Sequence, residues 1–125
     1  MPIRTIEFFQ ASPRPYNIEI GQGDTETIPA VLKEDGVGVD LTGNVITFRM
    51  INDLGSLDYD ITCTPGATAN GSPVPSTAGG ITIPFSSKES EASGLFFGAV
   101  KTNLFGVIST YPNTGYITIK INKSV

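Results

Sequence analysis

The residues best able to do chemistry in this sequence are its carboxylates, because the 125 residues include no histidine, no tryptophan and one cysteine. A chain without histidine lacks the side chain that most often acts as a general base near neutral pH. A single cysteine can form neither an internal disulfide nor a Cys/His zinc site. We therefore expect a protein that is not an enzyme and that carries no cofactor.

The densest group of oxygen-bearing side chains is Asn52, Asp53, Asp58 and Asp60. Such oxygens suit a hard cation such as Ca²⁺, but their spacing does not follow the EF-hand loop. Asp58 and Asp60 alternate with apolar residues, as the solvent-facing positions of a strand do. The pattern favours a solvated strand face over a metal site, and Asp53, Asp58 and Asp60 are the candidate ligands of the weaker alternative.

Two further patterns and the lone cysteine have simple structural explanations. Glu89 and Glu91 could pair as the carboxylates of a glycosidase, but the chain has no tryptophan on which a sugar could stack. Gly21-Gln22-Gly23 lacks the Lys-Ser/Thr ending of a phosphate-binding loop. Cys63 lies in a strand-like segment, so we expect a small buried side chain and not a reactive thiol.

The elements that must position these residues are short strands. Apolar and polar residues alternate with a period of two in many short segments, and glycine and proline separate them. This pattern predicts an all-β, antiparallel β-sandwich of about eight or nine short strands, with at most one helical turn at residues 86–94. The predicted strands lie at residues 5–9, 16–20, 27–32, 44–51, 57–63, 81–85, 95–101, 105–110 and 116–121.

Charge limits the partners of such a domain. The formal net charge is -4, so general attraction to a nucleic-acid backbone is not expected. No segment has the apolar length of a membrane span or a secretion signal, so we expect neither membrane insertion nor secretion. Residues 61–87 carry no charged side chain at all.

Two segments stand out as candidates for attachment to other subunits. Residues 1–15 are predicted to be an N-terminal arm, stiffened by prolines, that precedes a sandwich domain at 16–125. Residues 64–80 form a long uncharged stretch that is predicted to be a loop. Adjacent aromatic residues in a strand point to opposite faces, so one of each pair Phe8/Phe9 and Phe96/Phe97 should meet solvent or another chain. The predicted interface residues are Ile3, Ile6, Phe8, Phe9, Pro13, Pro15, Pro65, Pro73, Val74 and Pro75.

Several turns and strands follow one another in a recognisable order. The turn Gln22-Gly23-Asp24-Thr25 precedes an apolar strand, and Val39-Asp40-Leu41-Thr42-Gly43 leads into residues 45–50. The apolar segment 94–100 comes later, followed by residues 110–119, which contain Thr110-Tyr111-Pro112-Asn113. In this order the chain resembles the N-terminal domain of phage baseplate upper proteins. The resemblance implies an immunoglobulin-like sandwich of the kind that assembles phage tails and baseplates.

The resemblance therefore implies a structural virion protein. Members of that family continue into linkers and receptor-binding or coiled segments, whereas this sequence stops at Val125. This difference favours a head decoration or cement protein, with a tail or baseplate component as the alternative. The expected partners are the phage major capsid protein or tail and baseplate proteins, in a homo-oligomer or a lattice. The expected location is the virion, after synthesis in the host cytoplasm.

A carbohydrate-binding adhesion module is the alternative from another functional class. Such a module needs exposed aromatic rings as a platform for sugars. The residues that could supply it are surface phenylalanines and the four tyrosines Tyr16, Tyr59, Tyr111 and Tyr116.

Overall fold

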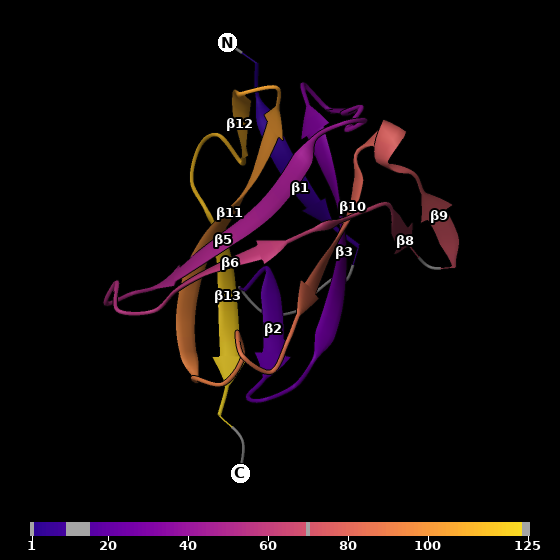
Figure 1. Ribbon diagram of the computed structural model, residues 1–125. Coiled ribbons are helices and arrows are strands. Elements are labelled where there is room, and N and C mark those ends of the chain that lie inside the picture. The colour runs from indigo at the N-terminus through magenta and orange to yellow at the C-terminus, as the bar shows by residue number, and fades with distance from the viewer. Residues whose placement is uncertain (1, 10–15, 70, 124–125) are drawn as a thin grey trace.

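Two β-sheets packed face to face form the body of the protein in the computed structural model, which describes residues 2–9, 16–69 and 71–123 (Figure 1). The β3 sheet contains β1 (Arg4–Phe8), β3 (Glu26–Glu34), β4 (Val37–Gly38), β7 (Thr64–Pro65) and β10 (Gly80–Phe85). The β11 sheet contains β2 (Ile18–Gly21), β5 (Val45–Asn52), β6 (Asp58–Thr62), β11 (Gly94–Leu104), β12 (Val107–Tyr111) and β13 (Ile117–Asn122). A separate two-stranded sheet consists of β8 (Ala67–Ala69) and β9 (Ser72–Val74), and the 3₁₀ turn η1 (Ser76–Ala78) follows it.

The strand order is that of an immunoglobulin domain. The β3 sheet runs β1-β3-β10-β7, which corresponds to strands A-B-E-D, and β13-β11-β5-β6 corresponds to G-F-C-C′. Neighbouring strands are antiparallel with one exception among the described residues, since β2 and β13 run parallel. The prediction of an all-β immunoglobulin-like sandwich is confirmed, and nine of its strands have four or more residues.

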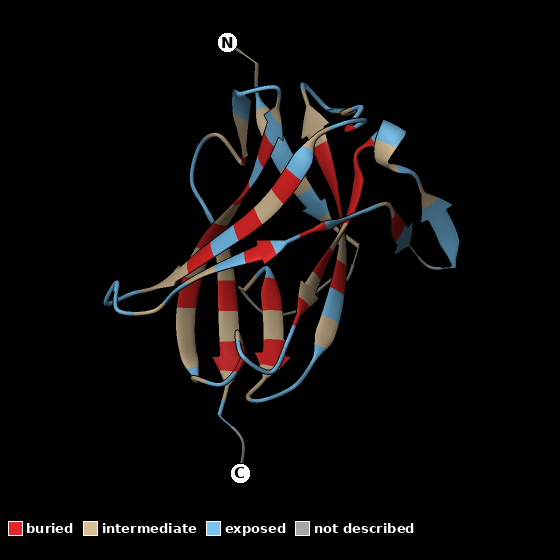
Figure 2. Ribbon diagram, viewed as in Figure 1, coloured by how far each residue is buried: buried red, intermediate tan, exposed pale blue. Residues whose placement is uncertain are grey.

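The core lies between the two sheets because each strand turns alternate side chains inward. In the β11 sheet, Ile46, Phe48 and Met50 of β5 are buried while Arg49 between them is exposed. Buried side chains of β3 and β10 face them from the other sheet, and the rings of Phe48 and Phe85 meet edge to face at 5.8 Å. Figure 2 shows the resulting alternation of buried and exposed bands along the strands.

Strand β1 belongs to the sandwich, so the predicted boundary between an arm at 1–15 and a domain at 16–125 is wrong for residues 4–8. Strand β1 pairs along its whole length with β3, from Arg4 opposite Glu34 to Phe8 opposite Ala30. Because Ile6 and Phe8 pack against the core, this edge strand contributes apolar burial that an arm could not keep in solution. Pro13 and Pro15 lie outside the described residues.

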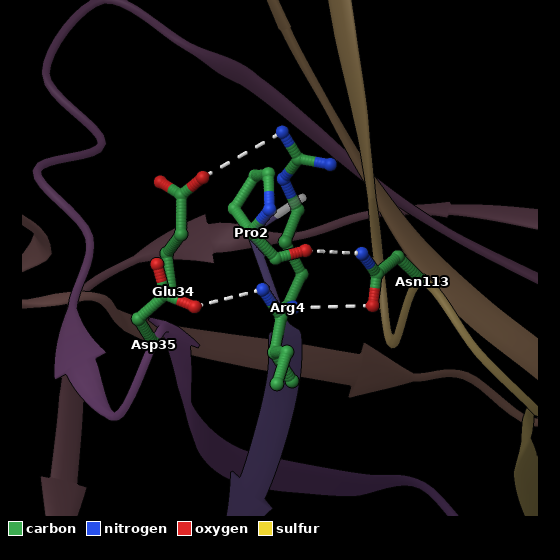
Figure 3. A network of polar contacts seen from close by, with 6 residues as sticks. Pro2, Arg4, Glu34, Asp35 and Asn113 are labelled. Atoms are coloured by element: carbon green, nitrogen blue, oxygen red, sulfur yellow. Dashed lines mark hydrogen bonds and ion pairs between the residues drawn. The ribbon is translucent and has the colours of Figure 1, made fainter.

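A cluster of hydrogen bonds holds the start of β1 (Figure 3). The side chain of Asn113 donates to the carbonyl of Pro2 at 2.8 Å and accepts from the amide of Arg4 at 3.1 Å. On the other side, Asp35 accepts from the amide of Ile3 at 2.9 Å, and the amide of Asp35 donates to the carbonyl of Ile3 at 2.8 Å. Asn113 follows β12 and Asp35 follows β3, so this cluster ties the two sheets together.

Within the predicted loop at residues 64–80, the described residues 64–69 and 71–80 contain β7, β8, β9 and η1. At residues 86–94, where one helical turn is predicted, the chain makes a single turn in which the amide of Ser90 donates to the carbonyl of Ser86 at 3.4 Å. Glu89 accepts hydrogen bonds from the amide and hydroxyl of Ser86, and the hydroxyl of Ser86 accepts from the amide of Lys88 at 3.3 Å, as in a capping box. The described 3₁₀ turn η1 lies elsewhere, at Ser76–Ala78. The buried hydroxyl of Ser90 donates to the carbonyl of Asp24 at 2.7 Å and fixes the turn at residues 86–94 to the body.

Candidate protein-interaction surfaces

The structure separates the predicted interface residues into two groups at opposite edges of the β3 sheet. One group lies on and beside β1, the first strand of that sheet, and the other surrounds β7, its last strand. In the first group Ile6 and Phe8 are half-buried against the core, Phe9 is half-buried and Ile3 is exposed. The described residues of the first group therefore serve mainly the chain's own fold, and among them Ile3 is the one whose apolar side chain is exposed.

The second group lines one groove, which we call the proline groove. Its volume is about 530 Å³. Pro65, Pro73 and Pro75 are exposed on it and Val74 is half-buried. It is lined by Thr64, Pro65, Gly66, Ala67, Thr68, Pro73, Val74, Pro75 and Thr82. All four interface residues predicted in this stretch therefore meet on a single surface.

Close backbone packing builds the proline groove. The amide of Gly66 donates to the carbonyl of Gly80 at 2.8 Å, and the amide of Gly80 donates to the carbonyl of Pro75 at 3.1 Å. The hydroxyl of Thr82 donates to the carbonyl of Gly66 at 2.8 Å. A side chain at Gly80 would place its Cβ 2.1 Å from the carbonyl oxygen of Val74, so only glycine permits this approach. The groove is thus formed before any partner arrives.

The residues that line the groove carry no charged side chain. No charged side chain occurs from residue 61 to residue 87. Cys63 is buried, and this burial raises the pKa of its thiol to about 12. The thiol therefore stays protonated at neutral pH, in line with the prediction of a buried cysteine. Apolar contact and backbone hydrogen bonding are what this surface can offer a partner.

Of the predicted calcium candidates, Asp58 is held by a structural partner, as is nearby Asn52, whereas Asp53 and Asp60 are exposed. Arg49 binds Asp58 through two nitrogens, at 3.1 Å from Nε to Oδ1 and 2.6 Å from Nη2 to Oδ2. This hydrogen bonding lowers the pKa of Asp58. Asn52 closes the β5–β6 hairpin, accepting from the amide of Leu57 and donating to the hydroxyl of Ser56. Within the described ranges, no three His, Cys, Asp or Glu side chains are grouped so that they could hold a metal ion.

Sequence reasoning missed a pocket on the outer face of the β11 sheet, which we call the aromatic pocket. Phe96 of β11 is buried in the core, so Phe97 points outward, where its ring meets that of Tyr116 edge to face at 4.8 Å. The pocket has a volume of about 290 Å³ and mostly apolar walls. Its residues are Arg49, Ile51, Phe97, Gly98, Ala99, Lys101 and Tyr116. The adjacent phenylalanines were the available signal, because one of them had to face outward.

The tyrosines considered for a carbohydrate platform are mostly unavailable. Tyr111 is 2% exposed, and Tyr59 packs against the core beside the ring of Phe96. Tyr16 is half-buried. Tyr116 is the strongly exposed tyrosine of the described chain, at 61%.

A second feature missed from the sequence is the turn between β11 and β12. The predicted strand 105–110 placed Phe105 inside a strand, but β12 begins at Val107 and Phe105 lies in the turn, 97% exposed. Val107 and Ile108 beside it are also exposed. The turn lies at the end of the sandwich where the N-terminus lies (Figure 1).

Comparison with known proteins identifies no family. No family model matches the sequence, and no curated protein matches it. Among solved structures, a family 123 glycoside hydrolase from Clostridium perfringens matches over 99% of this chain with 11% identity and a TM-score of 0.45. The matched part is 28% of the hydrolase chain, and a likeness at this level carries no functional argument. The part of the chain that the structure describes contains no helix with the length and hydropathy of a membrane span.

Proposed function

We propose that this chain is a structural, non-enzymatic virion protein that attaches to neighbouring coat or tail subunits through the proline groove. The observation that carries the proposal is the gathering of Pro65, Pro73, Val74 and Pro75 on one preformed, uncharged surface. The assignment to a phage particle rests on the resemblance to baseplate upper proteins. Head decoration is the first form of the proposal, and a tail or baseplate component is the second.

The proline groove favours a partner that packs side chains into it over a partner that adds a β-strand to the sheet. Pro65 occupies edge strand β7 and Pro73 occupies β9, and proline has no amide hydrogen with which to extend a sheet. A partner therefore contributes apolar side chains from a loop and not a pairing strand. Because the groove is already ordered, docking costs this chain little conformational entropy.

A single groove of this size supports weak binding, and attachment of many copies to the same particle makes the binding stronger. On a particle, many copies sit on equivalent subunits, so each bound copy that also contacts a neighbour raises the effective concentration of the next. An uncharged contact of this kind should depend little on salt, because there is no ion pair to screen.

The first experiment measures how many copies purified particles contain, by quantitative mass spectrometry. On the order of several hundred copies would support a head lattice, and about six, twelve or eighteen would support a tail or baseplate position, as the symmetries of those assemblies require. Absence from the particle would refute the virion proposal.

The second experiment tests the groove itself. Purified protein is added to particles that lack it, and bound protein is measured after sedimentation. Val74→Asp places a charge in the groove and should abolish binding, while Val37→Asp, an equally apolar change on exposed strand β4, should not. Circular dichroism checks whether both variants are folded. Full binding by a folded Val74→Asp protein would refute the groove as the attachment site.

A further inference from the structure

The β11–β12 turn uses a residue that its backbone disfavours. Phe105 has φ 51° and Gly106 has φ 88°, the two positive values of a type I′ hairpin turn. The β3–β4 turn of the same chain has nearly the same geometry, with φ 51° and 82°, and fills it with Asp35 and Gly36. Asp-Gly is a preferred pair for this turn, whereas an aromatic residue rarely adopts positive φ. The turn itself therefore does not require Phe105.

Phe105 also contributes nothing to the core. Its side chain is 97% exposed, and exposed Ile108 extends the apolar surface beside it on the outer face of the β11 sheet, whereas exposed Val107 points to the opposite face. Asn103 of β11 pairs with Ile108 of β12 on one side and with Val45 of β5 on the other. The exposed side chain of Val45 therefore lies on the same face of the sheet as that of Ile108. The side chain of Asn103 accepts from the amide of Gly106 at 2.9 Å and holds the turn in shape. A fixed, apolar projection results, which we call the Phe105 knob.

The aromatic pocket has the size and lining for such a side chain. Its volume of about 290 Å³ exceeds the roughly 150 Å³ in which an apolar cavity can hold benzene. Its walls include Ile51, Phe97, Ala99 and Tyr116, so an entering phenyl ring meets both aliphatic and aromatic surface. Lys101 lies at the pocket, where its ammonium group can approach the face of a bound ring.

The Phe105 knob cannot fill the pocket of its own chain. Ala99, in the middle of the pocket's lining on β11, is six positions from Phe105 along the strand and its turn, which corresponds to about 20 Å at the rise of a strand. Pairing with β5 on one side and with β12 and β13 on the other keeps β11 extended over this length. The chain therefore carries a knob and a matching hole that only a second copy can bring together.

Charge supports a second copy as the occupant. No charged residue lies between Lys101 and Lys120, so the knob brings no positive charge toward Arg49 and Lys101 of the pocket. The turn that contains Gly43 lies beside Leu104 and carries exposed Asp40, whose pKa is lowered by hydrogen bonds from Thr42. Lys101 has no ion-pair partner among the described residues, so its ammonium group is available to a carboxylate of an incoming copy.

We infer that copies of this chain associate head to tail, with the Phe105 knob of one copy in the aromatic pocket of the next. The contact is heterologous, because knob and pocket are different surfaces, so it builds rings or open chains and not closed two-fold dimers. This inference goes beyond the proposed function, since it concerns a different surface and a different partner.

The test uses the full chain and two matched variants. Phe105→Asn removes the knob and puts a favoured residue in the turn, and Ala99→Phe fills the pocket from an outward-facing position. Sedimentation velocity from about 10 µM to about 1 mM should show concentration-dependent growth for the wild type. Each variant alone should associate at least about tenfold more weakly, the loss typical of a central contact residue. Leu54→Asn, a change on another exposed turn at 84% exposure, should leave association unchanged.

Mixing the two variants distinguishes the knob-and-hole contact from any other association. Phe105→Asn keeps a good pocket and Ala99→Phe keeps a good knob, so an equimolar mixture should form a one-to-one dimer and nothing larger. A wild type that stays monomeric to about 1 mM would overturn the inference, as would a mixture that associates no more than its components. Circular dichroism checks that both variants are folded, and these outcomes leave the proline groove untouched.

Discussion

Replacing Phe105 with asparagine should make the protein more stable, although it removes an aromatic side chain. The backbone at this residue has φ 51°, in the left-handed region that asparagine adopts far more readily than phenylalanine. Asn-Gly is the preferred pair for a type I′ hairpin turn, and Gly106 already occupies the second position. The substitution therefore removes backbone strain without changing charge.

The size of the effect follows from two contributions. A left-handed conformation costs an ordinary residue about 1–2 kcal/mol, and most of this cost should be recovered. At 97% exposure the phenylalanine buries only a few per cent of its roughly 200 Å², so losing it costs about 0.2 kcal/mol. We expect the free energy of unfolding to rise by about 1 kcal/mol, and the midpoint of thermal unfolding by about 3–5 °C for a chain of this length.

Urea and thermal unfolding followed by circular dichroism measure this change at a concentration low enough to keep the protein monomeric. Ile108→Asn is the control, because it removes a neighbouring exposed apolar side chain from a regular strand position. That variant should be slightly less stable than the wild type, since asparagine is disfavoured in strands. A Phe105→Asn protein of equal or lower stability would show that Phe105 supports the fold after all.

Three further predictions concern other parts of the structure. Asn113→Ala removes hydrogen bonds to Pro2 and Arg4 and should lower the free energy of unfolding by about 1–3 kcal/mol in urea, with Asn113→Asp in between because it keeps the acceptor. Arg49 lowers the pKa of Asp58, so their stabilisation is present above the ordinary value of 3.8 and is lost as pH falls through the lowered folded value. Asp58→Asn should therefore cost stability at pH 6, and the cost should shrink as the pH falls below 3.8, which a pH series of unfolding curves checks. Cys63, with its pKa raised to about 12, should react with a thiol reagent at pH 8 only after unfolding.

Strands that alternate in hydrophobicity were predictable from the sequence. The segment predicted at residues 44–51 is β5 at Val45–Asn52, because its alternation reflects one buried and one exposed face. The strand at residues 5–9 was also predictable, but its place in the sandwich was not, so it was assigned to an arm. The partner of β1 is β3, whose paired residues lie 22 to 30 positions away, and local sequence does not reveal such pairing.

The candidate surfaces were predictable only in part. The uncharged stretch indicated a binding surface, and the structure does bring Pro65, Pro73, Val74 and Pro75 together. Composition could not show that backbone hydrogen bonds between Gly66, Gly80 and Pro75 would order this stretch. Phe105 was assigned to a strand because Phe-Gly is not a pair that signals a hairpin turn. The aromatic pocket is formed by residues of neighbouring strands, so it could not be predicted without knowledge of the strand order.

The placement of the two terminal strands affects how the protein responds to mechanical force. Strand β1 begins at one end of the sandwich and β13 finishes at the other, in different sheets (Figure 1). Tension applied between these ends would pull β1 lengthwise along β3, and β13 lengthwise along β2 and β11. Several hydrogen bonds would then have to break at once and not one after another. A protein with this geometry would resist stretching along its long axis far better than peeling from its side.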